Sequence, residues 1–376
     1  MEILVYSENL LGSSGGAEIY ALKLAEILSE NNLVSVLTVC NDSEANKAPE
    51  NVLKKYNIKH LNVKTVYFKH KKNNYLELLN RVALWLKIGK IAKKCDIFLN
   101  CSHNRLIGFR KIQCVHLVHF PMNNYCHFLP AFIGKFMNNW YRKSYKLFIS
   151  NSEFTKYHLL KEWNRESIVL NPPIVMSAVS ADVLNSKKKQ ILMVGRIVKD
   201  KKLIEMIDFF YSVKDKKEFE DYTLLIVGNR DLSEIEYFNL LCSRQIPNRI
   251  RIVTDVSFDT LVNFYRESEF FLHAKGFMED EFENPILMEH FGMTTVEAMA
   301  NGCIPIVINK AGQKEIVENG KSGFLWNTLT ELADSLSYII GNDSLKKTLQ
   351  INAVARAEHF LYPEFRTKVL EIFNRV

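Results

Sequence analysis

The stretch EHFGMTTVEAMANGCIPIVI, residues 289–308, decides the fold. It begins with a loop around Gly292, continues as a predicted helix from Thr295 to Asn301 and ends in a predicted buried strand from Ile304 to Ile308. The amides at the start of such a helix have no partner within it and can hold phosphate oxygens. The stretch therefore predicts a helix–strand unit of a parallel α/β sheet, with a ligand at the start of the helix.

Two carboxylates flank this loop, Glu289 before it and Glu297 in the first helical turn. Glu297 has two interpretations. It completes the capping-box pattern Thr294-x-x-Glu297, or it accepts hydrogen bonds from the hydroxyls of a bound sugar. The capping box accounts for neither Glu289 nor the glycine loop, so both interpretations remain open.

The alternation of apolar runs and amphipathic helices extends to both ends of the chain. A chain of 376 residues exceeds what one hydrophobic core usually supports, which favours two α/β domains. Because Asn171-Pro172-Pro173 breaks the alternation, we expect one domain at 1–171 and another at 172–362, with a last helix at 363–376 packed on either. The predicted strands are 2–7, 34–39, 63–68, 96–100, 112–118 and 146–150, then 191–194, 223–227, 250–253, 270–273 and 304–308.

Two further segments follow predicted strands. The segment NLLGSSGGAEI, residues 9–19, holds Gly15 and Gly16 before a helix, which favours a close approach of the backbone to an anion. Glycine-rich turns are also common in any sheet of this kind. Arg196 and Lys201 follow the strand at 191–194, where open α/β sheets bind ligands, and two cations at this spacing suit a diphosphate. The alternative is a solvated, lysine-rich loop.

Positive charge is concentrated in the first half of the chain. Residues 1–170 hold 24 Lys and Arg against 13 Asp and Glu, and the remainder holds 25 against 29. In a predicted helix, Leu78, Val82, Trp85 and Ala92 share one face, and Lys87, Lys90 and Lys94 lie opposite. This pattern indicates either a packed helix with a solvated lysine face or a contact with an anionic membrane surface or acceptor. Known nucleic-acid-binding signatures are missing, so we expect no nucleic acid partner.

The cysteine count and the apolar runs indicate a cytoplasmic protein. Seven cysteines form an odd set without metal-like spacing, which is typical of reduced thiols. No apolar run is long enough for a membrane span. The chain begins directly with a strand-like run, and we expect no leader.

The order of these motifs resembles the GT-B-fold retaining glycosyltransferases of family 4, over nearly the whole chain. The resemblance implies two Rossmann-like domains whose parallel sheets face each other across a cleft, an N-terminal one for the acceptor and a C-terminal one for the nucleotide-sugar. It rests on Gly15-Gly16-Ala17-Glu18, Val118-His119-Phe120-Pro121, Asn151-Ser152-Glu153-Phe154-Thr155, Gly195-Arg196 with Lys201, Glu289 with Glu297, and residues 298–305 and 312–325.

The resemblance also implies a role for individual residues, without a metal or a cofactor. His116 is a rival to His119, and a core histidine is the alternative interpretation of either. Asp255 stands where family members often have glycine, and the acidic insert 279–283 has no assigned role. The implied positions are Glu289 and His119 at the reaction centre; Arg196, Lys201, Gly292, Met293 and Thr294 at the diphosphate; Phe291 and Glu297 at the sugar and ribose; Gly15 and Gly16 at the phosphates and acceptor; and Gly228, Asp255 and Val256 at the base.

The activity implied is transfer of a hexose with retention, and the motifs resemble most closely the enzymes that transfer mannose from GDP-mannose to a glycan or lipid-linked acceptor. A peripheral position at the cytoplasmic face of a membrane agrees with the basic first half. One alternative is a UDP-sugar-dependent enzyme that transfers glucose or N-acetylglucosamine to a surface polysaccharide or a protein. Another is a nucleotide-sugar-binding protein without catalysis, and a sugar phosphorylase or an epimerase is a third.

Overall fold

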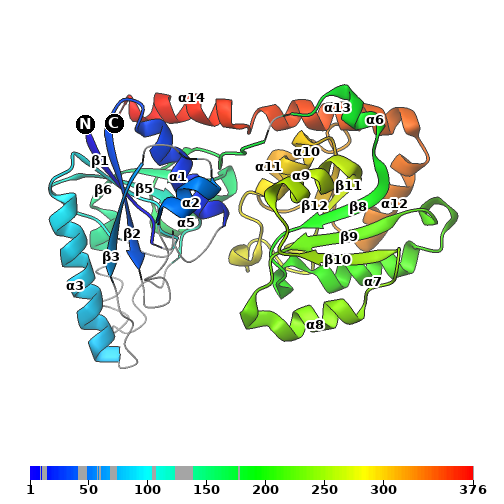
Figure 1. Cartoon of the computed structure of the whole chain (residues 1–376), viewed down its shortest axis with the longest axis horizontal. Coiled ribbons are helices and arrows are strands. Elements are labelled where there is room, and N and C mark those ends of the chain that lie inside the picture. The colour runs from blue at the N-terminus through cyan, green and yellow to red at the C-terminus, as the bar shows by residue number, and fades with distance from the viewer. Residues whose placement is uncertain are drawn as a thin grey trace. The chain divides into compact units, whose positions relative to one another are not determined.

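The structure is a computed structural model that describes residues 1–8, 10, 15–40, 49–56, 58, 61–67, 74–103, 107–122, 139–176 and 178–375. It divides into two compact units (Figure 1). Unit 1 is Met1–Pro173 together with Phe365–Val376, and unit 2 is Ile174–Glu364. Among the described residues, no helix is both long enough and apolar enough to cross a membrane.

Unit 1 is built on a parallel sheet with the strand order β3-β2-β1-β4-β5-β6-β7. The sheet agrees with the predicted alternation, and it adds the two-residue strand β7, which is too short to show a pattern. The strands are β1 (Glu2–Tyr6), β2 (Leu33–Cys40), β3 (Asn62–Tyr67), β4 (Ile97–Asn100), β5 (Gln113–Val118), β6 (Tyr145–Ser150) and β7 (Ile168–Val169), and the helices are α1 (Gly16–Leu28), α2 (Pro49–Lys55), α3 (Asn74–Ala92), α5 (Glu153–Trp163) and most of α14 (Tyr362–Phe373).

The sequence identifies the packed face of α3 only in part. Ala92 is fully buried, and Trp85 packs against the same core cluster. Val82, predicted on the packed face, is 47% exposed, because the buried positions are instead Leu84 and Ile88. The apolar face predicted from the sequence therefore differs from the buried face of α3 by part of a helical turn. The side chain of Leu78 lies outside the described residues.

Unit 2 is built on a second parallel sheet, with the order β10-β9-β8-β11-β12-β13. Helices α7, α8 and α12 contribute to the core on one face, and α9, α10 and α13 cover the other (Figure 1). The strands are β8 (Lys188–Val194), β9 (Thr223–Gly228), β10 (Ile250–Thr254), β11 (Ser268–His273), β12 (Ile304–Ile308) and β13 (Phe324–Trp326), and the helices are α6 (Ala181–Asn185), α7 (Leu203–Val213), α8 (Ile235–Ser243), α9 (Phe258–Glu267), α10 (Met293–Ala300), α11 (Gln313–Ile316), α12 (Leu329–Ile340) and α13 (Asp343–Glu358), with short 3-10 turns η1 (Lys199–Lys201), η2 (Lys217–Phe219), η3 (Leu232–Glu234) and η4 (Pro285–Leu287).

Candidate functional site

The predicted helix start after Gly292 is present in unit 2. Helix α10 begins at Met293, and its N-cap residue Gly292 has φ of 125° and provides no side-chain cap. The first amide bonded within the helix is that of Thr295, which donates to the Gly292 carbonyl at 3.0 Å, so the amides of Met293 and Thr294 precede the first helical bond. An added Cβ at Gly292 would lie 2.3 Å from Nε2 of Gln313. Glycine is therefore required here both by conformation and by space.

Glu297 does not form the predicted capping box, because α10 already begins at Met293 and Thr294 is not its N-cap residue. The carboxylate of Glu297 instead accepts a hydrogen bond from the Tyr265 hydroxyl at 2.8 Å. Burial raises the pKa of Glu297, and the bond from Tyr265 opposes this only in part. Lys187 connects Tyr265 to the end of α10. Its ammonium donates to the backbone carbonyl of Tyr265 at 3.0 Å and to that of Asn301, at the end of α10, at 2.5 Å. A cation at this end of a helix is favourable to its dipole.

Glu289 lies at the centre of a compact charged cluster. Its carboxylate is 2.5 Å from the ammonium of Lys201 and 3.3 Å from Nε2 of His273. Burial alone would raise the pKa of Glu289, but the charge of Lys201 and the hydrogen bond from His273 outweigh it, so the pKa is well below its usual range. Burial lowers the pKa of His273, which favours a neutral ring that donates to the carboxylate. Glu289 and Lys201 therefore form an ion pair near neutral pH.

The carboxyl ends of β8 and β9 approach each other closely beside this cluster. A Cβ at Gly228 would lie 1.8 Å from the carbonyl oxygen of Gly195, and one at Gly195 would meet the side chain of Lys201 at 3.4 Å. The guanidinium of Arg196 lies 3.9 Å from Asp231 and is 68% exposed. Unit 2 thus has a largely buried cation, Lys201, and an exposed one, Arg196, at the strand ends where open α/β sheets bind ligands.

The residues predicted at the base lie at the ends of β9 and β10. Asp255 has φ of +56°, the region that favours glycine, which accounts for glycine at this position in the resembling family. Its carboxylate accepts a hydrogen bond from Arg230 at 2.8 Å, and both side chains are about half exposed. Val256 packs at the edge of the core beneath α9.

The acidic insert 279–283 is held between two loops of unit 2. Glu279 pairs with Lys202 at 2.9 Å. Glu281 accepts from the amide of Ala311 at 2.9 Å and pairs with Lys314 at 2.7 Å. No group of His, Cys, Asp and Glu side chains among the described residues has the arrangement of a metal site. The insert therefore links the turn that carries Lys201 to the loop before Gln313.

The predicted residues of unit 1 form a separate arrangement. Nε2 of His119 lies 3.4 Å from the carbonyl of Cys101, and its own carbonyl accepts from Nδ2 of Asn151 at 3.1 Å and from Oγ1 of Thr155 at 3.3 Å. Burial, with a smaller effect of His103, lowers the pKa of His119 to about 4. The segment from Asn151 to Thr155 thus fixes the backbone that carries His119.

The rival His116 is a core residue. Its ring stacks on Tyr145 and on Trp163, and burial lowers its pKa to about 3. Gly15 is the N-cap residue of α1, and its amide donates to Glu18 at 3.0 Å. Residues 9 and 11–14 of the predicted glycine loop lie outside the described residues.

Four side chains of unit 2 were missed by the sequence reasoning: Tyr265, Lys187, His273 and Gln313. Gln313 is fully buried, its Oε1 accepts from Thr295 at 2.8 Å, and its Nε2 has no partner among the described residues. Only His273 gave a signal in the sequence, as a polar residue at the end of an apolar strand. The others lie far along the chain from the residues they support.

The two parallel sheets define the chain as a protein of the GT-B fold. Crystal structures of Anabaena HepE in complex with UDP and of TarM align with it over 99–100% of this chain, with TM-scores of 0.76 and 0.72 and identities of 18% and 12%. HepE is covered over 100% of its length and TarM over 98%. At these identities the likeness shows the fold alone.

The family follows from the sequence of unit 2. Residues 179–356, which make up most of unit 2, match the family described as Glycosyl transferases group 1, and this region belongs to that family. The capsular polysaccharide biosynthesis glycosyltransferase CapM of Staphylococcus aureus is 29% identical over 171 residues, which is 44% of this chain and 40% of CapM. The human GDP-Man:Man(3)GlcNAc(2)-PP-Dol alpha-1,2-mannosyltransferase is 28% identical over 246 residues, 60% of this chain and 48% of that protein. These matches span less than half the length of either relative.

Proposed function

We propose that this protein is a retaining glycosyltransferase that transfers a hexose from a nucleotide-sugar to a glycan or lipid-linked acceptor. The observation that carries the proposal is the start of α10, where the amides of Met293 and Thr294 precede the first helical hydrogen bond, with the Lys201–Glu289 ion pair before them in the chain and the Glu297–Tyr265 pair after them. Amides and a lysine suit a diphosphate, and carboxylates on either side suit sugar hydroxyls. Membership of the glycosyltransferase family supports the same assignment.

The chemistry we propose is departure of the nucleoside diphosphate from the anomeric carbon. Negative charge then develops on the phosphates, and Lys201, Arg196 and the positive end of the α10 dipole stabilise it. Glu289 lies beside the sugar, and Glu297 accepts hydrogen bonds from the ribose. The acceptor hydroxyl attacks from the face that the diphosphate leaves, so no covalent nucleophile is assigned. We propose that the reaction needs no metal and that His119 contacts the donor sugar.

The donor we propose is GDP-mannose. The match to the GDP-mannose-dependent relative over 60% of the chain supports it. A UDP-sugar is the second candidate, because HepE was solved with UDP-glucose and TarM with UDP. The acceptor we propose is anionic and held by the basic unit 1, at the cytoplasmic face of a membrane.

The test begins with calorimetry of the whole protein against GDP, UDP, GDP-mannose, UDP-glucose and UDP-N-acetylglucosamine. Donor-dependent release of nucleoside diphosphate is then measured with and without a chelator. Binding of GDP-mannose in preference to UDP-sugars supports mannosyl transfer, and the reverse order supports the second candidate. Absence of binding to any nucleotide contradicts the proposal. Loss of activity in the chelator that manganese restores contradicts its metal-free part.

A further inference from the structure

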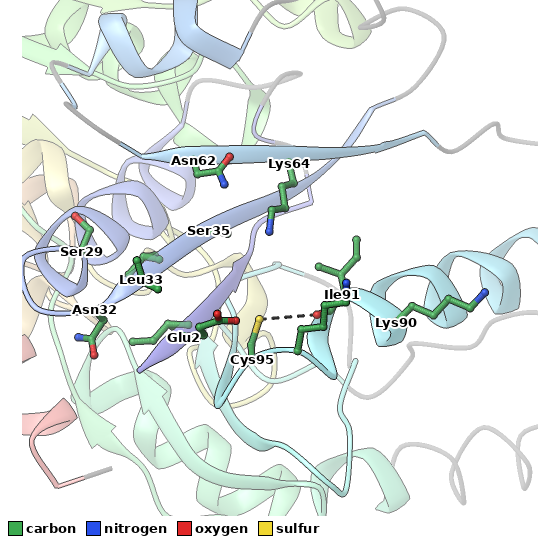
Figure 2. Close-up of a pocket in the computed structure, with 13 residues that line it drawn as sticks. Glu2, Ser29, Asn32, Leu33, Ser35, Asn62, Lys64, Lys90, Ile91 and Cys95 are labelled. Atoms are coloured by element: carbon green, nitrogen blue, oxygen red, sulfur yellow. Dashed lines mark hydrogen bonds between the residues drawn. The ribbon is translucent and has the colours of Figure 1, made fainter.

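Unit 1 contains a cavity at the edge of its sheet formed by the amino-terminal ends of the strands, opposite to the edge formed by their carboxyl ends. It lies at the amino-terminal ends of β1, β2 and β3, next to the last turn of α3, and its volume is about 1050 Å³ (Figure 2). The glycine segment with Gly15 follows the carboxyl end of β1. The cavity is therefore separated from that segment by the length of the strand. Its lining residues are Glu2, Ile3, Ser29, Asn32, Leu33, Val34, Ser35, Asn62, Lys64, Lys90, Ile91, Lys94 and Cys95.

The cavity continues the layer between α3 and the sheet beyond the end of the helix. In the body of the unit this layer is apolar, with Leu4, Leu37 and Val66 on the strands. Two residues earlier on each strand, facing the same side, are Glu2, Ser35 and Lys64. The change from apolar to polar side chains occurs on all three strands at once, past Ala92, where α3 ends. The interlayer space is therefore left open and is polar at this edge.

The charges and hydrogen-bonding groups of the cavity favour an anion. The ammoniums of Lys64 and Lys94 form no hydrogen bond or ion pair with any described residue, and neither do the side chains of Ser35 and Asn62. Figure 2 shows Lys64 extending from β3 toward the side where Glu2 and Cys95 lie, whereas Lys90 is directed along the helix at the rim. In the lining three lysines stand against Glu2, and Asp96 lies next to it with its carboxylate 2.8 Å from the Glu2 amide, so the balance stays positive by one charge.

Unpaired cations at one site repel one another, and an oxyanion removes that repulsion. The carboxylate of Glu2 accepts hydrogen bonds and suits hydroxyls on the group that carries the anion. We propose that this cavity binds a phosphate ester of a polyol or sugar, independently of the nucleotide site in unit 2. The phosphate contacts Lys64 and Lys94, and the hydroxyls contact Glu2, Ser35 and Asn62.

Two sources offer this chemistry, a soluble phosphate ester and the headgroup of an anionic lipid. Cys95 provides a direct reporter, because its thiol lines the cavity and is partly exposed. Cys242 in unit 2 is a matched internal control, since it is also partly exposed and its pKa is also raised by burial. Alkylation of each cysteine by iodoacetamide is followed by peptide mass spectrometry in the whole protein.

We expect glycerol 3-phosphate to slow alkylation of Cys95 saturably, by about threefold at twice its Kd, where two thirds of the sites are occupied. Sodium chloride at equal ionic strength has no such effect, and Cys242 is unchanged. Lys64→Gln and Lys94→Gln lose the protection, whereas Lys161→Gln on the exposed side of α5 keeps it. Protection by phosphatidylglycerol vesicles but not by glycerol 3-phosphate identifies a lipid headgroup as the source. Absence of saturable protection by either, equal protection of Cys242, or protection that survives both lysine variants overturns the proposal.

Discussion

Glu289 neutralises Lys201 in the absence of a donor, and removing the charge of Glu289 tests whether Lys201 then binds a diphosphate more tightly. The two groups are 2.5 Å apart, with side chains 23% and 17% exposed. Since the pKa of Glu289 in the folded protein lies below that of an unfolded carboxyl, the pair is charged near neutral pH and is lost only as the pH falls through the lowered value. Glu289→Gln keeps the shape and leaves Lys201 free for a diphosphate. We expect the variant to bind free nucleoside diphosphate more tightly while losing transfer.

The size of the effect follows from the charges. Two unit charges about 4 Å apart interact by roughly 4 kcal/mol at an effective dielectric constant of about 20. Partial exposure and salt reduce this, and we take about 1.5 kcal/mol, which corresponds to about a tenfold lower Kd. Transfer is expected to fall by at least about a hundredfold, as it does when one electrostatic contact at a reaction centre is removed.

Glu279→Gln is the matched control, because Glu279 pairs with the adjacent Lys202 at 2.9 Å with similar exposure, 26% and 17%. Both variants lose one ion pair and about 1 kcal/mol of stability, or roughly 2–4 °C in Tm. Only Glu289→Gln should change the affinity for UDP or GDP by calorimetry. An unchanged or weaker affinity in Glu289→Gln, or an equal gain in both variants, would refute the assignment of Lys201 to the diphosphate.

Three further predictions concern the supports of the site. Lys187→Met leaves two buried carbonyls unpaired and should cost about 2 kcal/mol, or roughly 4–8 °C in Tm, whereas the exposed Lys189→Met should change Tm by less than about 2 °C in thermal unfolding. Tyr265→Phe should raise the pKa of Glu297 further, so the calorimetric affinity for nucleotide should begin to fall at a higher pH than in the parent as the pH decreases; coincident profiles would contradict this. Arg196→Gln should slow association in stopped-flow, reduce its salt dependence and weaken the affinity for nucleoside diphosphate; an unchanged affinity would contradict a contact of Arg196 with the phosphates.

The sequence predicted both sheets and most of the candidate site, because these depend on local pattern. An apolar run predicts a buried strand, and a glycine before a helix predicts an anion site, wherever the partner segments lie. The strand order β9-β8-β11 places the segments that follow these three parallel strands at one edge of the sheet. Lys201 and Glu289 could thus be expected in one cluster although 88 residues separate them.

The parts that could not be predicted depend on contacts between distant segments. The capping-box pattern at Glu297 fails because the helix begins one residue before Thr294, with Gly292 as the N-cap residue, and the Glu297 carboxylate is bound by Tyr265 from 32 residues away. Lys187 looks like a member of a solvated lysine run, and only the fold shows that its ammonium reaches the end of α10. On α3, a shift of part of a turn exchanges Val82 with Leu84 at the core, and helical periodicity alone does not resolve such a shift.

The candidate donor site of unit 2 is nearly neutralised by its own side chains, and this predicts an order of events for the proposed binding. Lys201, Lys202 and Lys314 each lie within 3 Å of a carboxylate oxygen. Arg196 is held only at 3.9 Å and is the most exposed of these cations, so an incoming diphosphate meets it together with the amides of α10. In the proposed reaction Lys201 contacts the diphosphate only after it leaves Glu289, and this exchange frees the Glu289 carboxylate beside the sugar, where positive charge develops. The Lys201–Glu289 ion pair therefore lowers the affinity of the empty site for a diphosphate, and in the proposed complex it supplies the carboxylate beside the sugar. For this reason Glu289→Gln should increase the affinity for nucleoside diphosphate and decrease the rate of transfer.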